Sequence, residues 1–94
     1  MNVIFHETQM ERFLMTNNEK LKIIQKHFKL KASKIAEICF KTSVETVWAW
    51  RTKRDSVRFR TMNDGEYALL VDWLIKNEHV TNQEELNAIL GSQK

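Results

Sequence analysis

The chain has 94 residues and a formal net charge of +3, with no proline, two glycines and one cysteine. This length fits one domain with a modest hydrophobic core, so we expect no second domain. The single cysteine, Cys39, excludes an internal disulfide, and its apolar neighbours predict a buried thiol rather than a nucleophile. The scarcity of turn residues and the many Leu, Lys, Glu, Ile and Met residues predict an all-α fold of five to six helices.

The charges are distributed unevenly along the chain. Residues 1–19 carry a net charge of −2, residues 20–60 a net charge of +9, and residues 61–94 a net charge of −4. A basic middle between acidic ends is typical of a module that binds nucleic acid, because clustered cations neutralise phosphates. A solvated lysine surface without a partner is the alternative explanation.

The first residues, Met1 to Phe5, are apolar, but acidic rather than small residues follow them, which is unlike a signal peptide. No apolar run approaches the roughly 20 residues that span a bilayer. We therefore expect a soluble, cytoplasmic protein with no membrane partner.

Apolar residues at helical spacing predict three helices in the first half of the chain. They cover residues 5–15, about 19–28, and a third stretch that begins near residue 33. The caps and ends expected for these helices are Asn17 or Asn18 before the second, Ala32 or Ser33 at the start of the third, and Phe40 at its end.

A fourth helix is predicted over residues 43–54. Two capping pairs are possible at its start, Thr42 with Glu45 or Ser43 with Thr46, and the first has the chemistry of a capping box. Three cations within four residues close this stretch, at positions 51, 53 and 54. Hydroxyl caps, an apolar side and a cationic end are typical of a helix that lies against nucleic acid.

Residues 55–62 alternate between apolar and polar side chains, with Val57 and Phe59 opposing Arg58 and Arg60. A lone strand would have no partner, so we expect an extended connection. Two more helices follow, over residues 65–77 and 82–90. Their expected caps are Asn63 or Asp64 for the first and Thr81 or Asn82 for the second, with Thr81 and Glu84 as a capping box and Gly91 as the stop.

Two short segments in the basic region carry a pattern of their own. Ile35 to Cys39 places the small Ala36 where two helices must approach closely, and Ser43 to Val47 is followed by Trp50 three residues later. In this pattern residues 21–54 resemble the helix-turn-helix of Cro/repressor-type transcriptional regulators, especially small phage and bacterial ones. Lys41 stands where that family usually has a turn glycine, and the spacing from Ala36 to Val47 is one residue longer, so a longer or differently shaped turn is expected.

The resemblance implies a helix-turn-helix motif over about residues 33–54, with Val47 and Trp50 in the core. Helical spacing independently places a second group of residues on a shared face that differs from the face of Val47 and Trp50: Val44, Glu45, Trp48 and Thr52. The candidates for facing DNA bases are Ser43, Val44, Glu45, Trp48, Ala49 and Thr52. The candidates for contacting phosphates are Lys34, Lys41, Thr42, Arg51, Lys53, Arg54 and Arg58.

Two of these residues have competing roles. Glu45 can accept a hydrogen bond from cytosine N4, or it can close a capping box on its own helix. Trp48 is large for a groove-facing position, so it could instead contact a protein or belong to the core of a rotated helix. Val44 and Ala49 are small enough to meet a thymine methyl group.

Other chemistry has little support. His6, His27 and His79 have no second histidine or cysteine at ligand spacing, so we expect no metal. We find no glycine-rich phosphate loop, no marked carboxylate pair and no nucleophile with an identifiable base. We therefore expect no cofactor and no enzymatic activity.

The sequence thus predicts a sequence-specific regulator of transcription, a repressor that binds double-stranded DNA as a homodimer. Apolar residues left at the two ends could pair the subunits or could pack onto the central helices; they are Val3, Ile4, Phe5, Leu86, Ile89 and Leu90. Two alternatives remain. One is an adaptor that docks on host transcription or replication proteins, and the other is an accessory protein of DNA packaging or recombination.

Overall fold

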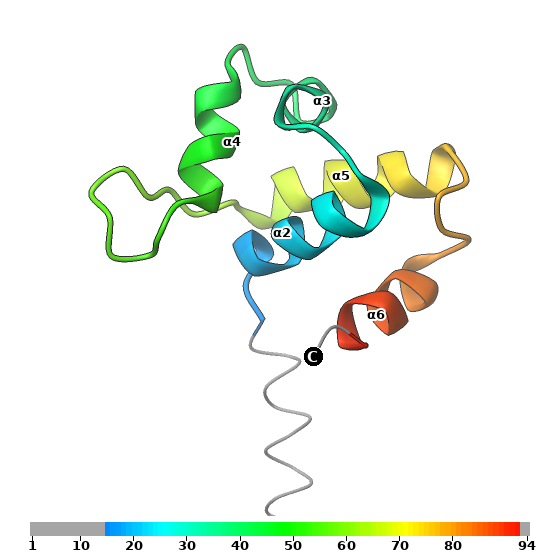
Figure 1. Cartoon of the computed structure of the whole chain (residues 1–94). Helices are drawn as coiled ribbons and strands as arrows, with labels where there is room; N and C mark the ends of the chain where they lie inside the picture. Colours follow the sequence, from blue (N-terminus) through cyan, green and yellow to red (C-terminus); the bar gives the residue numbers. More distant parts are fainter. Residues whose placement is uncertain (1–14, 93–94) are drawn as a thin grey trace, which may run out of the picture.

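The computed structural model describes residues 15–92, and this range is all-helical, with no strand (Figure 1). Its helices in chain order are α2 (Asn17–Phe28), α3 (Ala32–Ile38), α4 (Val44–Arg51), α5 (Asp64–Lys76) and α6 (Gln83–Gly91). The all-α fold expected from the sequence is confirmed. Residues 5–14 of the helix predicted over residues 5–15 lie outside the described residues, and Met15 is not helical.

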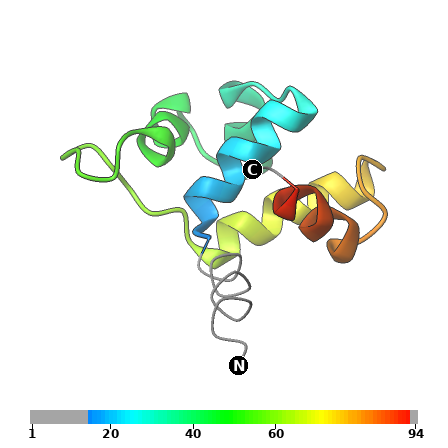
Figure 2. The same ribbon diagram turned by 60° about the horizontal axis from the view of Figure 1, so that its bottom comes forward.

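Two central helices, α2 and α5, support the others. α4 packs against α3 and α2, α5 packs against both α2 and α3, and α6 packs against α2. α4 lies at one end of the molecule and the last turn of α5 at the other (Figure 1). The connection between α4 and α5 extends away from the helices in both views (Figures 1 and 2).

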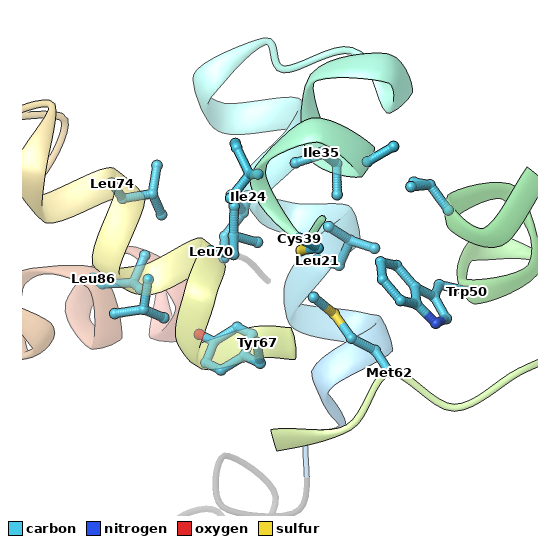
Figure 3. Packing of buried hydrophobic residues seen from close by; sticks show 14 of the residues in the cluster. Leu21, Ile24, Ile35, Cys39, Trp50, Met62, Tyr67, Leu70, Leu74 and Leu86 are labelled. Carbon is cyan, nitrogen blue, oxygen red and sulfur yellow. The ribbon is translucent and has the colours of Figure 1, made fainter. Parts of the chain in front are cut away.

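The core lies where α2, α3, α4 and α5 meet. α2 contributes Leu21 and Ile24, which lie three residues apart and therefore on one side of the helix, and both are fully buried. α4 contributes Trp50, which points toward Leu21 and Met62 in the interior (Figure 3). Burying a side chain of this kind contributes about 1.5–3 kcal/mol relative to leaving it exposed, so these contacts fix α4 on the body of the domain.

The apolar residues of α6 complete the same core. Leu86 is 0% exposed and Leu90 is 5% exposed, and Ile89 is partly buried against them. Of the two roles considered for these three residues, packing onto the central helices is therefore confirmed. Val3, Ile4 and Phe5 lie outside the described residues.

The N-cap of α2 differs from the expected one. Thr16, rather than Asn17 or Asn18, caps the helix: its hydroxyl accepts from the Glu19 amide at 3.1 Å, and the Glu19 carboxylate accepts from the Thr16 amide at 2.8 Å. This reciprocal pair is a capping box. The two asparagines are the first two residues of the helix, and their side chains reach other parts of the chain.

The last two helices begin and end within one residue of the predicted positions. Asn63 caps α5 and forms a capping box with Glu66. Asn82 caps α6 by accepting from the Glu85 amide at 2.9 Å, so the capping box predicted between Thr81 and Glu84 is wrong. The Thr81 amide donates to the Glu85 carboxylate instead, which moves the same chemistry one residue along the chain.

Three helices end on residues with left-handed backbone and a side chain. These residues are Lys29 with φ 58°, Phe40 with φ 59° and Glu78 with φ 63°. Around Phe40, the Lys41 amide donates to the Ala36 carbonyl at 2.8 Å and the Phe40 amide donates to the Glu37 carbonyl at 3.2 Å. This pair of hydrogen bonds is a Schellman motif, in which glycine is the usual left-handed residue.

The Schellman motif corrects one expectation about the turn between α3 and α4. α3 ends at Ile38 rather than continuing through Phe40, and Phe40 is the left-handed residue. α3 also starts without a side-chain cap, since its N-cap position is Lys31. The turn therefore forms without glycine, at the cost of a strained Phe40.

The search for membrane-spanning helices covered the described residues. Within that range, none of the helices combines the length and the apolar character that crossing a bilayer requires.

Candidate nucleic-acid interface

α4 has one buried side and one exposed side. Val47 is 0% exposed and Trp50 is 2% exposed, whereas Trp48 is 57% exposed. With about 100° between successive residues, Trp48 and Glu45 point away from the side that carries Val47 and Trp50. The core positions of Val47 and Trp50 are confirmed, and the alternative that Trp48 belongs to the core is wrong.

The start of α4 leaves the Glu45 side chain unused. Ser43 is the N-cap, and its hydroxyl accepts from the Glu45 amide at 3.0 Å. Neither expected capping pair forms, and Thr42 is exposed just before the cap. The Glu45 carboxylate is exposed and forms no ion pair with another described residue. The capping-box role considered for Glu45 is therefore wrong.

The remaining predicted base-facing residues are less exposed. Val44 is partly buried and packs against the core. Ala49 is half-buried, and its carbonyl accepts from the Arg60 amide at 3.2 Å. Thr52 is half-buried and has extended backbone, so α4 ends at Arg51 rather than at residue 54. The exposed centre of the α4 surface therefore consists of Glu45 and Trp48.

Asn18 of α2 holds the C-terminal end of α4 in place. Its side-chain amide donates to the Trp50 carbonyl and to the Arg60 carbonyl, both at 2.8 Å. Its side-chain oxygen accepts from the Met62 amide at 3.0 Å. Asn18 is 4% exposed, so these hydrogen bonds lie in the interior and satisfy backbone groups that no helix pairs. One side chain thus joins α2, α4 and the connection that follows α4.

The connection between α4 and α5, residues 52–63, is ordered by its own hydrogen bonds. The Ser56 amide donates to the Lys53 carbonyl at 3.0 Å, and the Phe59 amide donates to the Ser56 carbonyl at 3.1 Å. The Arg60 guanidinium donates to the carbonyls of Val57 at 3.1 Å and of Phe59 at 2.8 Å. The segment is a connection without a strand, as expected, but it turns instead of running extended.

The side chains of this connection do not alternate as the sequence suggested. Val57 is 91% exposed, whereas Phe59 is half-buried. They lie on different sides because two successive turns replace the expected extended backbone. Val57 consequently projects into solvent at the end of the molecule that carries α4.

Besides Arg60, whose guanidinium donates to two backbone carbonyls, four cations of α4 and the connection have no acidic partner in the described part of the chain. They are Arg51, Lys53, Arg54 and Arg58, and all four are exposed. The ion pairs among residues 15–92 join Lys34 to Glu37, Lys41 to Glu66, and Lys76 to Asp72. The four cations therefore give the α4 end of the molecule a positive charge that these ion pairs do not neutralise.

Two of the residues predicted to contact phosphates also have partners within the molecule. The Lys34 ammonium lies 3.6 Å from the Glu37 carboxylate and 5.4 Å from the centre of the Trp73 ring. The Lys41 ammonium pairs with Glu66 at the start of α5, and both side chains are largely buried. These contacts join α3 and its following turn to α5, so they stabilise the fold without requiring DNA.

A cation that the sequence analysis did not single out lies beside this group. A pocket of about 160 Å³ lies between the start of α2 and the connection after α4, and Lys22, Thr52, Arg54 and Phe59 line it. Lys22 thus shares a pocket with Arg54, although 32 residues separate them. Because Lys22 is one of several lysines in α2, the sequence did not indicate that it lies near Arg54.

Phe40 was also missed as a surface feature. It is 80% exposed in the turn before α4, and it adopts the left-handed backbone that favours glycine. Neither its burial nor its backbone accounts for an aromatic residue at this position. Strained residues of this kind often mark functional surfaces.

Cys39 has the buried, unreactive character predicted from its neighbours. It is 3% exposed, and its thiol donates to the Glu66 carbonyl at 3.5 Å. Burial, reinforced by the negative Glu66, raises the pKa of the Cys39 thiol to about 11. The thiolate is the nucleophilic form, so this environment disfavours reaction near neutral pH.

The two histidines among residues 15–92, His27 and His79, contact aromatic rings rather than potential metal ligands. His79 stacks on Trp73 with ring centres 5.1 Å apart and meets the edge of Phe28 at 5.6 Å, and His27 contacts Phe28 at 4.7 Å. Residues 15–92 hold no group of three or more His, Cys, Asp or Glu side chains suited to a metal ion.

Comparisons of this chain with protein-family models, with curated proteins and with solved structures found no match. A functional proposal therefore depends on the residues of this chain and their arrangement.

Proposed function

We propose that this protein is a sequence-specific, double-stranded DNA-binding regulator of transcription. In this proposal α3 and α4 act as a helix-turn-helix, and α4 enters the major groove. The protein acts in the cytoplasm as a repressor. The observation that carries the proposal is the exposed face of α4, which lies beside four cations that lack acidic partners among residues 15–92.

The dimensions of α4 suit the major groove. An α-helix with its side chains is about 10–12 Å in diameter, and the major groove of B-DNA is about 12 Å wide, so α4 can lie within the groove. Val47 and Trp50 hold one side of the helix in the core, so the opposite side remains available for contacts. Asn18 fixes the C-terminal end of α4, and a rigid helix loses little conformational entropy on binding.

The charged residues divide into two groups with different tasks. Arg51, Lys53, Arg54 and Arg58 contact phosphates, which supplies affinity that depends on salt but not on sequence. The exposed centre of α4 contacts base edges, which supplies sequence preference. Lys34 and Lys41 already have acidic neighbours in Glu37 and Glu66, so the count of phosphate contacts used below leaves them out.

Homodimer formation is also part of the proposal. A symmetric dimer places two copies of α4 on successive turns of the groove and requires an inverted repeat in the DNA. Leu86 and Leu90 are buried within the subunit and are therefore unavailable for pairing. Pairing must use other surfaces than these two side chains.

Selection of bound duplexes from a random DNA pool, with the mass of the complex measured, tests the proposal. A palindromic consensus bound by two chains is the expected result. Enrichment of an asymmetric site by one chain would remove the dimer but keep DNA recognition. The absence of enrichment above a charge-matched control protein would contradict sequence-specific binding.

The exposed aromatic residues favour one further candidate function, an adaptor that docks on host transcription or replication proteins. Phe40 is 80% exposed and Trp48 is 57% exposed, and aromatic residues are enriched in protein interfaces. Partner binding that persists after Arg51, Lys53 and Arg54 are all changed to Gln would favour this candidate. Loss of binding together with DNA affinity would favour DNA recognition.

A further inference from the structure

The exposed centre of α4 offers hydrogen-bond acceptors and apolar surface for contact with bases. Glu45 presents a carboxylate with no ion pair among the described residues, and Trp48 presents an indole that is 57% exposed. Ala49 adds a methyl group at the half-buried edge of this face. The strong side-chain donors that bind guanine or adenine in pairs of hydrogen bonds are Arg, Lys, Asn and Gln, and none of these lies at positions 44–50.

Arg51 is the one strong donor in α4, and it lies at the flank of this face. At about 100° per residue, it is about 40° from the buried Val47 and about 120° from Glu45. That position suits contact with the sugar–phosphate backbone at the edge of the groove. It leaves base contacts at the centre of the face to Glu45 and Trp48.

Each of these two side chains fits one pyrimidine. An ionised carboxylate only accepts hydrogen bonds, and cytosine presents the N4 donor in the major groove. Adenine presents a donor too, but beside the N7 acceptor, which a carboxylate repels. Thymine presents its C5-methyl group, which the indole of Trp48 can cover.

We propose that α4 recognises pyrimidine edges, with Glu45 selecting cytosine and Trp48 covering one or more thymine methyl groups. This inference rests on the proposed function, because it names the bases that the same face would bind. Glu45 and Trp48 are separated by about 4.5 Å along the helix, and successive base pairs by about 3.4 Å. The cytosine and the thymine therefore lie within one or two base steps of each other.

Glu45 also disfavours other sequences. A carboxylate near phosphates is repelled unless a donor on the DNA satisfies it, so this residue weakens binding wherever cytosine is absent. Thr52, half-buried at the end of α4, can donate or accept and imposes little preference. The specificity of the face should consequently depend mainly on two positions.

Replacing thymine by deoxyuridine in the duplex enriched from the random pool tests the Trp48 contact. This change removes one methyl group and leaves base pairing intact. Wild-type protein should lose affinity roughly fourfold for each contacted thymine, the value expected for one buried methyl group. Trp48→Ala should show no such loss. Thymines outside the consensus are the control positions and should be insensitive in both proteins.

A second pool selection, with Glu45→Gln, tests the cytosine contact. Glutamine can both donate and accept, so it pairs with adenine, and the preferred base at one position should change from cytosine to adenine by roughly tenfold. Glu84→Gln in α6 removes the same charge from an exposed residue at another part of the molecule and should leave the consensus unchanged. Thermal melting confirms that each variant folds.

The outcomes separate this inference from the proposed function. An enriched consensus that lacks a cytosine within two base steps of a thymine, or an affinity that deoxyuridine does not lower, would overturn the inference and leave sequence-specific DNA binding intact. A consensus that Glu45→Gln does not change would likewise overturn the cytosine contact. Failure of wild-type protein to enrich any duplex would contradict the proposed function itself and this inference with it.

Discussion

Two tryptophans on α4 lie two residues apart and have opposite surroundings. Trp50 is 2% exposed among Leu21 and Met62, and Trp48 is 57% exposed on the other side of the helix. Core packing explains the tryptophan at position 50. It does not explain the tryptophan at position 48, because removing the Trp48 indole would leave every described core contact in place. The same residue type therefore stabilises the core on one face of α4 and, under the proposed function, is available to a partner on the other.

Removing each indole in turn is the strongest test of this difference. Trp50→Ala should lower the free energy of unfolding by about 3–5 kcal/mol, because it leaves a large cavity in the core. Trp48→Ala should change it by less than about 0.5 kcal/mol, as expected for an exposed residue. Urea denaturation of both variants measures the contrast. Similar losses in the two variants would contradict the assignment of the two faces.

Asn18 holds the C-terminal end of α4 against the body of the domain. Asn18→Ala removes two buried hydrogen bonds and one partly buried hydrogen bond, and leaves backbone groups of Trp50, Arg60 and Met62 without those partners. We expect a loss of about 2–4 kcal/mol in the free energy of unfolding. Asn87→Ala in α6, at an exposed position, is the matched control and should cost less than about 0.5 kcal/mol. Equal effects would show that Asn18 does not join these segments.

The stability of the core should depend on pH in the alkaline range, because two buried core residues, Cys39 and Tyr67, have raised pKa values. Burial raises the pKa of Cys39 from 9.0 to about 11 and the pKa of Tyr67 from 10.0 to about 12. The unfolded chain thus loses protons that the folded chain still holds, so stability should be undiminished below pH 9 and should fall as the pH rises through this range.

The loss attributable to Cys39 should be about 1–3 kcal/mol between roughly pH 9 and 11. Cys39→Ala should remove that part of the decline while the part due to Tyr67, which begins near pH 10, persists. Urea denaturation at several pH values measures both. A decline of the same size and starting pH in Cys39→Ala would show that the thiol is not the group responsible.

The smallest expected effect concerns the turn that leads into α4. Phe40→Gly should raise the free energy of unfolding by about 0.5–1 kcal/mol, because glycine adopts the left-handed backbone without the strain that a side chain adds. Phe40→Ala keeps a Cβ atom and should give no comparable gain. If Phe40→Gly raises the free energy of unfolding but weakens binding to the enriched duplex, Phe40 belongs to the same functional surface as Trp48.

Local signals in the sequence were sufficient to predict much of the fold. α5 and α6 were placed within one residue because each combines an apolar stripe with a nearby asparagine cap. The division of α4 into a face with Val47 and Trp50 and a face with Glu45 and Trp48 also followed from helical spacing. Such patterns involve residues fewer than five positions apart, so the sequence displays them directly.

The errors came from contacts between distant residues. Asn17 and Asn18 have the chemistry of caps, but Asn17 donates to the Met62 carbonyl and to Asp64, and Asn18 bonds three backbone groups 32 to 44 residues away. Thr16 therefore caps α2 instead. Lys34 and Lys41 likewise have neighbours far along the chain, Trp73 and Glu66, that the sequence did not indicate. No short-range pattern marks such partners.

The central claim is that the cations beside the exposed face of α4 contact DNA phosphates. The salt dependence of binding to the enriched duplex measures this most directly. If Arg51, Lys53, Arg54 and Arg58 each neutralise one phosphate, log affinity should fall against log salt with a slope of about −3.6 per subunit.

Arg54→Gln should make this slope less steep by about 0.9. Lys76→Gln lies in the last turn of α5, which Figure 1 shows at the opposite end of the molecule from α4, and should leave the slope unchanged. A slope near zero for the wild-type protein, or equal changes in the two variants, would contradict the claim.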